Sequence, residues 1–474
     1  MQKEKFTGLI FLLLAITGVV FYYHFPQMLH MLPQGSHLWR QADCMAMVWN
    51  YKLYHFPFFQ PATFNLQSIN GHVAGEFPVF YFMAAQCSNP ELALRLVHSI
   101  VFLSGMISIY FLAFYFLKNA FLSVITSLLL FTSPLLVFYG NNFLSDVPAW
   151  SFAMMGWSLF FTQKETPKWR SLAFLFFACS ALLKASYGFN FAIAFIYQLS
   201  PINKQLSFKK LIPYAIFLIP ASWYSYAKWY NSQNHDSYYF LGILPAWEMS
   251  LHDIGLSFWR MIVSWSENYF WRPTSVLLII ILIYAFIKNQ INIELKRMIL
   301  ISGIFTLIYV LLFLERMQMH EYYYVLFFVI AVFIVIACIH FIEPFIQKKW
   351  AKAFLIIFLL INIFYCKNFL ARKLSFQNYN GILASDDFQK FLDEKGCTKN
   401  KTVISWFDKS VNQSLYWMKR KGYTGYNDYP TVFKNKMADY LVLSETDFLG
   451  YKTLNISPSD SIGNFHGIVL YKLK

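Results

Sequence analysis

An arginine and an aspartate stand three residues apart soon after the first long apolar run, in the stretch Ser-His-Leu-Trp-Arg-Gln-Ala-Asp that ends at Asp43. If residues 39–54 form a helix, its 3.6-residue period places Arg40 and Asp43 on or near one face. The other face carries Trp39, Ala42, Ala46, Trp49 and Leu53. This pattern predicts an amphipathic helix in the membrane surface, with its apolar side in lipid and Asp43 facing a cavity. We therefore expect Asp43 to be a catalytic base in a membrane enzyme.

The composition places the chain in a bilayer. Of its 474 residues 57% are hydrophobic, 20% are aromatic and only 13% are charged. Apolar runs long enough to cross roughly 30 Å of hydrocarbon recur along most of its length. We place spans at 5–24, 92–117, 120–139, 147–163, 169–184, 186–200, 210–229, 274–288, 297–314, 322–342 and 350–366. The prediction is about eleven transmembrane helices, one fewer if two short neighbours merge.

The distribution of lysine and arginine sets the predicted orientation. With a cytoplasmic N-terminus, the inside loops contain Lys118; Lys164, Lys168 and Arg170; Lys204, Lys209 and Lys210; Lys288, Lys296 and Arg297; and Lys348, Lys349 and Lys352. The opposite loops are poor in basic residues, as the positive-inside rule requires. The net charge of +15 is then explained by anionic lipid headgroups, and nucleic acid is a poor partner. Residues 1–24 lack a small-x-small cleavage site, which predicts an uncleaved anchor.

The predicted architecture is a polytopic α-helical membrane module, residues 1–366, followed by a small α/β domain, residues 367–474. An odd number of spans places this domain outside the cytoplasm. Its predicted elements are helices at 385–394 and 410–421, the second ending at Gly422, and strands at 401–407, 438–443 and 467–471. It has no GxGxxG or Walker sequence, so nothing indicates a nucleotide site.

The first external loop, residues 25–91, is too long for a turn and too apolar for a soluble domain. We expect it to lie on the membrane with a second surface helix that has Pro78 in its first turn. Glu76 precedes that helix, where a carboxylate either caps amide groups or belongs to the site. Cys44 and Cys87 also lie in this loop, and an oxidising compartment would permit a disulfide between them.

Further charged residues lie in the other predicted external loops. Asp146 precedes a span that starts with Pro148, so it serves as an N-cap, as a site residue, or as both. With Asp43 it would form a pair of carboxylates that raises the pKa of each or binds a divalent cation. Lys184 is expected either to pair with an anion or to extend to the headgroups. Arg316 and His320 are expected to contact a phosphate or hydroxyl. The alternative is that Glu315 and Arg316 pair locally and that His320 is only an interfacial residue.

The predicted external loops carry carboxylates and cations near the lipid surface, and the chain has no nucleotide-binding motif. This combination fits group transfer from a lipid-linked donor. A phosphate leaving group needs fixed positive charge as it departs. An acceptor hydroxyl needs a carboxylate base within hydrogen-bond reach. The dense aromatic residues of the loop at 230–273, Tyr238 and Tyr239 among them, either anchor the chain at the interface or stack on sugar rings.

Four motifs in order resemble those of the GT-C membrane glycosyltransferases. They are Trp39-Arg40-Gln41-Ala42-Asp43, Gly75-Glu76-Phe77-Pro78, Ser145-Asp146-Val147-Pro148 and His320-Glu321-Tyr322-Tyr323. The similarity is greatest to bacterial members of the dolichyl-phosphate-mannose protein mannosyltransferase superfamily, which includes the lipid A aminoarabinose transferases. It covers roughly residues 1–345.

This resemblance implies a bacterial inner-membrane enzyme with a polyprenyl-phosphate sugar as donor and a hydroxyl of an envelope lipid, glycan or protein as acceptor. It implies hexosyl or pentosyl transfer with inversion, with Asp43 as the base, Asp146 at the second acidic position and Glu76 at the third. Phe77 replaces a lysine of the family motif, so Arg40, Lys184, Arg316 or His320 would bind the donor phosphate. Some members use a divalent metal, which Asp43 and Asp146 would hold.

The rival interpretation is a multispan transporter or lipid flippase. Transporters usually carry ionisable groups at mid-membrane and show inverted repeats. Here the charges gather at span ends and the sequence shows no repeat, which favours the transferase.

Overall fold

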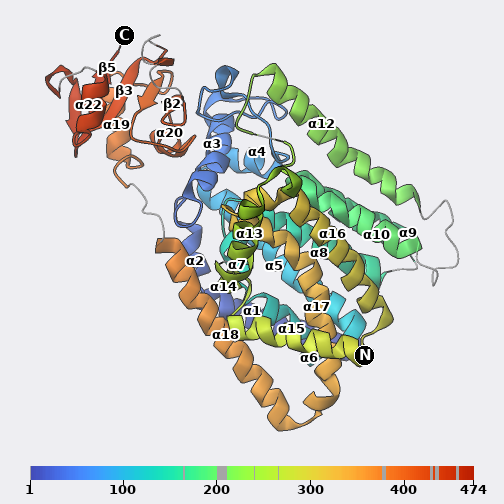
Figure 1. Cartoon of the computed structure of the whole chain (residues 1–474). Coiled ribbons are helices and arrows are strands. Elements are labelled where there is room, and N and C mark those ends of the chain that lie inside the picture. The colour runs from blue at the N-terminus through green and yellow to red at the C-terminus, as the bar shows by residue number, and fades with distance from the viewer. Residues whose placement is uncertain are drawn as a thin grey trace. The chain divides into compact units, whose positions relative to one another are not determined.

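The computed structural model of the chain describes residues 2–163, 166–199, 211–239, 241–264, 266–375, 381–427, 431–432, 437–454 and 458–473. Four lysines of the predicted basic loops, Lys164, Lys204, Lys209 and Lys210, lie outside these ranges. The chain forms two compact units. Figure 1 labels the helices and strands that make them up. We call residues 1–30, 95–224 and 242–373 the helical unit, and residues 31–94, 225–241 and 374–474 the mixed unit.

The helical unit consists mainly of apolar helices. Its elements are α1 (Gln2–Tyr22), α2 (Phe25–Leu29), α5 (Pro90–Leu117), α6 (Ala120–Leu130), α7 (Pro134–Gly140), α8 (Asp146–Thr162), α9 (Pro167–Leu183), η2 (Ala185–Gly188), α10 (Phe189–Leu199), η3 (Ile212–Phe217), α12 (Leu218–Gln233), η4 (Ala246–Glu248), α13 (Leu251–Trp259), η5 (Arg260–Ser264), α14 (Ser266–Tyr269), α15 (Arg272–Ile287), α16 (Ile293–Met317), η6 (Glu321–Phe327), α17 (Phe328–Ile342), η7 (Glu343–Gln347) and α18 (Lys349–Ser375). Helix α5 begins with residues of the other unit, and helices α12 and α18 end with residues of it.

Each predicted span coincides with a helix or a consecutive helix pair. Among the described residues, five helical segments are long and apolar enough to cross a bilayer: Gln2–Tyr22, Pro90–Leu117, Ile293–Met317, Glu321–Gln347 and Lys349–Ser375. The sixth is a pair, α6 and α7, bent by 74° where Ser133 and Pro134 interrupt the helix. The remaining apolar helices are shorter. A polytopic helical fold is therefore confirmed, while the number eleven stays a prediction.

Helices α8 and α9 pack side by side over most of their length. Gly156 makes this possible, because a Cβ there would lie 2.5 Å from the Phe177 ring. Their close packing brings the start of α8, at Asp146, beside the end of α9: the Ser145 hydroxyl donates to the Leu183 carbonyl at 3.2 Å. This geometry positions two of the predicted site residues, Asp146 and Lys184.

The mixed unit combines the first predicted external loop with the C-terminal residues. It contains α3 (Leu38–Tyr54), η1 (Ile69–Gly71), α4 (Val79–Ala85), α19 (Asp386–Glu394), β1 (Val403–Ser405), α20 (Gln413–Met418), β2 (Gly422–Thr424), β3 (Tyr440–Ser444), α22 (Phe448–Leu454), η8 (Pro458–Asp460), β4 (Gly463–Phe465) and β5 (Ile468–Lys472). The sheet order is β2-β1-β3-β5-β4, with β1 parallel to β2 and β3, and β5 antiparallel to β3 and β4.

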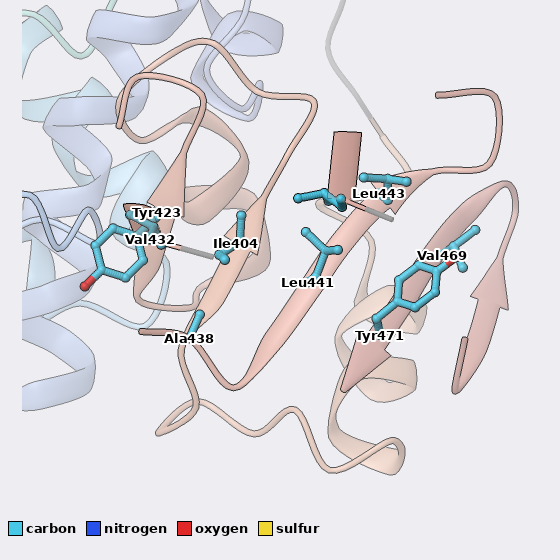
Figure 2. Close-up of a cluster of buried hydrophobic side chains, with 9 residues drawn as sticks. Ile404, Tyr423, Val432, Ala438, Leu441, Leu443, Val469 and Tyr471 are labelled. Atoms are coloured by element: carbon cyan, nitrogen blue, oxygen red, sulfur yellow. The ribbon is translucent and has the colours of Figure 1, made fainter. Parts of the chain in front are cut away.

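One face of this sheet carries its own apolar core (Figure 2). The buried side chains are Ile404, Tyr423, Val432, Ala438, Leu441, Leu443, Leu454, Val469 and Tyr471. Three predicted strands and the helix at 385–394 are confirmed as β1, β3, β5 and α19, whose N-cap is Ser385. The second predicted helix is shorter than expected: it ends at Met418, because Lys419 adopts a left-handed conformation, and Gly422 begins strand β2.

Residues 64–66 of the first predicted external loop extend this sheet at the β2 edge. The Gly422 N–H donates to the Phe64 carbonyl at 3.0 Å, and the Leu66 N–H donates to the Gly422 carbonyl at 2.8 Å. Only glycine fits here, because a Cβ on Gly422 would lie 1.8 Å from the Val403 carbonyl oxygen. The loop and the C-terminal residues thus share one hydrogen-bonded ladder.

The cysteines form no disulfide: all six are free. Cys44 is buried on α3, where its sulfur accepts a hydrogen bond from Tyr81 at 3.3 Å, while Cys87 is exposed. The bridge considered between Cys44 and Cys87 is therefore absent. The reason is that the two side chains occupy different environments, one inside the fold and one at its surface.

Candidate active site

Helix α3 carries Arg40 and Asp43. Its bounds, Leu38–Tyr54, confirm the predicted helix. The prediction that one side faces lipid is wrong for Ala42 and Ala46, which are fully buried. The physical reason is that α4 and α20 pack against α3, so protein covers positions that the sequence pattern assigned to lipid. Helix α3 therefore packs inside the protein and positions the polar side chains of Arg40 and Asp43.

The Asp43 carboxylate is buried and hydrogen-bonded through both oxygens. Its side chain is 1% exposed. The Tyr238 hydroxyl donates to Oδ2 at 2.9 Å, and the Asn412 amide nitrogen Nδ2 donates to Oδ1 at 2.9 Å. Nη1 of Arg40 lies 3.8 Å from Oδ2, one helical turn away on α3. The carboxylate on α3 is therefore held by two residues far away in the sequence, Tyr238 and Asn412, and by Arg40 of its own helix.

Glu76 acts through Arg40. The Arg40 Nη2 lies 2.6 Å from Glu76 Oε1, and the guanidinium lies 5.5 Å from the centre of the Tyr239 ring. The capping role considered for Glu76 is not observed, since α4 has Pro78 as its N-cap residue and no side-chain cap hydrogen bond. Arg40 thus lies between two carboxylates, and Glu76 fixes its position beside Asp43.

Burial sets the protonation behaviour of Asp43. Loss of hydration raises the pKa of Asp43 from 3.8 to about 6. The Arg40 charge and the hydrogen bonds from Asn412 and Tyr238 lower this pKa, whereas the Glu76 charge raises it. The result is a carboxylate that is ionised at neutral pH but more basic than an exposed aspartate. That combination suits a general base.

Asn412 and Tyr238 were not predicted as site residues. Asn412 stands immediately before α20 in the C-terminal part of the chain, and its Oδ1 accepts a hydrogen bond from the Asn65 backbone N–H at 2.9 Å. Tyr238 lies in the loop after α12, where Asp236 accepts hydrogen bonds from the Tyr238 and Tyr239 backbone. The only sequence signal was the aromatic density around Tyr238; a lone asparagine gave none.

A second polar cluster lies in the helical unit around Asp146. The Lys184 Nζ is 2.9 Å from Asp146 Oδ1, which confirms the expectation that this lysine has an anionic partner. Asp146 is the first residue of α8, and Ser145, not Asp146, occupies the N-cap position. The preceding loop is fixed by Arg95, which donates to the Asn141 carbonyl at 3.0 Å.

Aromatic rings connect Lys184 with His320. The Lys184 Nζ lies 5.3 Å from the centre of the Tyr322 ring and 4.7 Å from that of Tyr323. The His320 ring stacks on the same two tyrosines, with centroid distances of 5.3 and 6.1 Å. Arg316, in the last turn of α16, has no ion-pair partner among the described residues, so the local pair with Glu315 is not observed.

Glu321, next to His320, forms a buried ion pair with Lys373 at the end of α18. The Tyr139 hydroxyl of α7 donates to the same carboxylate oxygen at 3.0 Å. Neither Lys373 nor Tyr139 was predicted. This pair joins three elements, α7, η6 and α18, next to His320.

The residues around Asp43 do not form a set of metal ligands. Its neighbours are a guanidinium, a hydroxyl donor and an amide donor, and Arg40 lies between Asp43 and Glu76. Among the described residues, no three His, Cys, Asp or Glu side chains are grouped to hold an ion. Asp146 belongs to the other unit, so a shared metal with Asp43 stays a prediction.

Solved structures share the fold of this chain. ArnT from Cupriavidus metallidurans in the apo state matches 99% of this chain and 98% of its own length, with a TM-score of 0.63 and 11% identity. The same protein bound to undecaprenyl phosphate matches 98% of each chain, with a TM-score of 0.63 and 10% identity.

The archaeal oligosaccharyltransferase AglB from Archaeoglobus fulgidus, in complex with an inhibitory peptide and a dolichol-phosphate, matches 93% of this chain and 70% of its own, with a TM-score of 0.54 and 11% identity. No protein-family model and no curated protein sequence matches the chain. ArnT and AglB are both GT-C glycosyltransferases. The chain therefore has the GT-C fold that its four motifs predicted.

Proposed function

We propose that this chain is a membrane glycosyltransferase that moves a hexose or pentose from a polyprenyl phosphate to a hydroxyl group of an envelope acceptor. The fold supports this class, since one neighbour is bound to undecaprenyl phosphate and another to dolichol-phosphate. The single observation that carries the proposal is the buried Asp43 carboxylate, hydrogen-bonded at both oxygens and adjacent to Arg40.

In the proposed step, Asp43 takes the proton of the acceptor hydroxyl as its oxygen attacks the anomeric carbon. The bond from this carbon to the phosphate oxygen breaks, and its electron pair leaves with the polyprenyl phosphate. Attack from the opposite side inverts the anomeric centre. Asp43 suits this role because its pKa of about 6 leaves it ionised, yet basic, at neutral pH.

The departing phosphate requires positive charge. Arg40, Lys184, Arg316 and His320 are the proposed sources of it. Arg316 has no competing carboxylate among the described residues, whereas Lys184 already pairs with Asp146. In this proposal Asp146 holds Lys184, and Glu76 holds Arg40.

The proposed location is the extracytoplasmic face of the bacterial inner membrane. The first predicted external loop and the C-terminal residues belong to the same mixed unit and share one β-ladder. This shared ladder supports the proposal that both lie on one side of the membrane, the side to which the positive-inside rule assigns the loop.

The test uses the full chain in nanodiscs with a panel of undecaprenyl-phosphate sugars and an envelope lipid and glycan extract. We expect acceptor-dependent release of undecaprenyl phosphate, and a loss of several orders of magnitude in Asp43→Asn. Binding of undecaprenyl phosphate alone and the unfolding temperature report whether the variant remains folded.

Asp387→Asn is the matched control, because Asp387 is a 79% exposed carboxylate of the same unit and should leave release unchanged. An active Asp43→Asn variant overturns the assignment of the base. Counter-flow of labelled solute in liposomes without any release of undecaprenyl phosphate overturns the transferase and supports a transporter.

A further inference from the structure

We propose that the part of the mixed unit that follows α18, here called the C-terminal domain, completes the active site. In this proposal Asn412 is a positioning residue that holds the Asp43 carboxylate in the orientation needed for proton transfer. This inference rests on the proposed function of Asp43 as a base. It gives the residues after α18 a part in the reaction through their hydrogen bond to Asp43.

The first argument is the geometry of the carboxylate. The terminal torsion of an aspartate is broad, so helix α3 alone does not fix the plane of the Asp43 oxygens. Tyr238 binds one oxygen at 2.9 Å, and Asn412 binds the other at 2.9 Å. Two donors on opposite oxygens define that plane. Tyr238 is provided by the loop after α12, and Asn412 only by the C-terminal domain.

The second argument is that Asn412 is itself fixed. Its side chain is fully buried, and its carbonyl oxygen accepts the Asn65 backbone N–H at 2.9 Å. An asparagine amide has one acceptor end and one donor end. Because the acceptor end meets an N–H group and the donor end meets a carboxylate, only one of the two amide orientations satisfies both partners.

The third argument is the set of contacts that hold α20 against the first predicted external loop. Tyr416 on α20 donates to Glu91 at 3.1 Å, and Trp49 on α3 donates to the same oxygen at 2.7 Å. Lys419 lies 3.9 Å from the centre of a Trp49 ring, and Lys421 donates to the Asn70 carbonyl at 2.9 Å. These contacts, with the β-ladder at Gly422, keep Asn412 in place.

A hydrogen bond donated to a carboxylate favours its charged form, so loss of the Asn412 amide should raise the pKa of Asp43. The other polar or charged groups near Asp43 are Arg40, Cys44, Glu76, Tyr238 and Tyr239. None of these groups is altered in an Asn412 variant, so a shift in the pKa of Asp43 is attributable to Asn412.

The experiment measures the transfer rate against pH for the full chain and two variants. In Asn412→Ala the midpoint of the acid limb should move up by about one pH unit. The rate should then fall about tenfold at pH 5 and by less than about twofold at pH 9. Asn412→Asp keeps the acceptor oxygen but adds a like charge, so its midpoint should lie higher still.

Asn362→Ala is the matched control. Asn362 is also a buried asparagine, but its side chain donates to the Phe358 carbonyl at 2.9 Å and accepts from the Thr274 hydroxyl instead of binding Asp43. Its loss should lower the unfolding temperature and leave the midpoint where it is. A purely structural role for Asn412 predicts the same behaviour for Asn412→Ala, namely an equal loss at every pH, and that result overturns the inference.

An infrared titration separates this inference from the proposed function. The difference spectrum between the wild type and Asp43→Asn isolates the Asp43 carboxyl band, whose midpoint is measurable without any sugar donor. A midpoint raised in the Asn412→Ala background, in protein that transfers no sugar, supports the positioning role and contradicts the transferase. Transfer with an unchanged midpoint supports the transferase and contradicts the positioning role.

Discussion

Asp43 has four polar neighbours whose effects on its pKa differ in sign. Arg40, Asn412 and Tyr238 favour the carboxylate, and Glu76 opposes it. Since a base must be ionised to act, transfer should rise as the pH passes through about 6 and stay level above it. Each neighbour therefore has a predictable effect on the midpoint of that rise.

Two substitutions should move the midpoint in opposite directions. Tyr238→Phe removes a hydrogen bond to the carboxylate and should raise the midpoint by roughly 0.5–1 pH unit. Glu76→Gln removes a nearby negative charge and should lower it by a similar amount. The measurement is the rate of polyprenyl phosphate release from pH 4.5 to 9.

Tyr226→Phe serves as the control for this pair, because the Tyr226 hydroxyl donates to the Phe59 carbonyl and not to Asp43. Shifts of the same sign for Tyr238→Phe and Glu76→Gln would contradict the electrostatic account of the site.

The residues of the site differ in how far the sequence predicts them. Arg40 and Asp43 are three positions apart on one helix, so helical periodicity places them together. Tyr238 and Asn412 are 195 and 369 positions from Asp43 and lie in a loop and before a short helix. No local pattern connects such positions, because tertiary packing alone brings them together.

At the scale of elements, the end of α18 is held by one buried ion pair. Lys373 bonds Glu321 of η6, and the Tyr139 hydroxyl of α7 donates to the same oxygen. Removing one partner of a buried pair leaves an uncompensated charge and typically costs about 3–5 kcal/mol.

Lys373→Met should therefore lower the unfolding temperature of the purified chain by several degrees, and adding Glu321→Gln should recover much of the loss. Arg372→Ala is the control: its side chain is 64% exposed and lies 3.7 Å from Glu267, and exposed pairs contribute about 0–1 kcal/mol. A double variant less stable than Lys373→Met would show that the pair is not the source of the effect.

Long apolar helices were predictable because hydropathy over about 20 residues leaves few alternatives. Ser133 and Pro134 are a local sequence signal for the bend between α6 and α7. Hydropathy averaged over about 20 residues does not detect this bend, because both helices are apolar. Strands β2 and β4 were missed, since three residues are too few for an alternating pattern to appear.

At the scale of the whole molecule, the mixed unit is assembled from three separate stretches of chain. The change in composition near residue 367 predicted a C-terminal domain. It did not predict that residues 31–94 would belong to the same compact unit, since pairing between residues 64–66 and Gly422 has no signature in either segment.

The proposed orientation places the C-terminal residues outside the cytoplasm. A reporter enzyme that is active only outside the cytoplasm should therefore be active when fused after Lys474. The same reporter should be inactive when inserted after Lys348, in a predicted inside loop. A cytoplasmic green fluorescent protein fused at the two positions should give the reverse pattern. Equal activity at both positions would contradict the orientation.

In the proposed mechanism, the separation of Asp43 from Asn412 also determines when the carboxylate reaches its final geometry during synthesis of the chain. At about 5–20 residues per second, a ribosome needs roughly 20–70 s to make the 369 residues between them. Throughout that interval the nascent chain has Arg40 and Asp43 but lacks the Asn412 amide. A chain cut short before Asn412 should therefore show the raised midpoint of the acid limb that is expected for Asn412→Ala, and not the midpoint of the full chain.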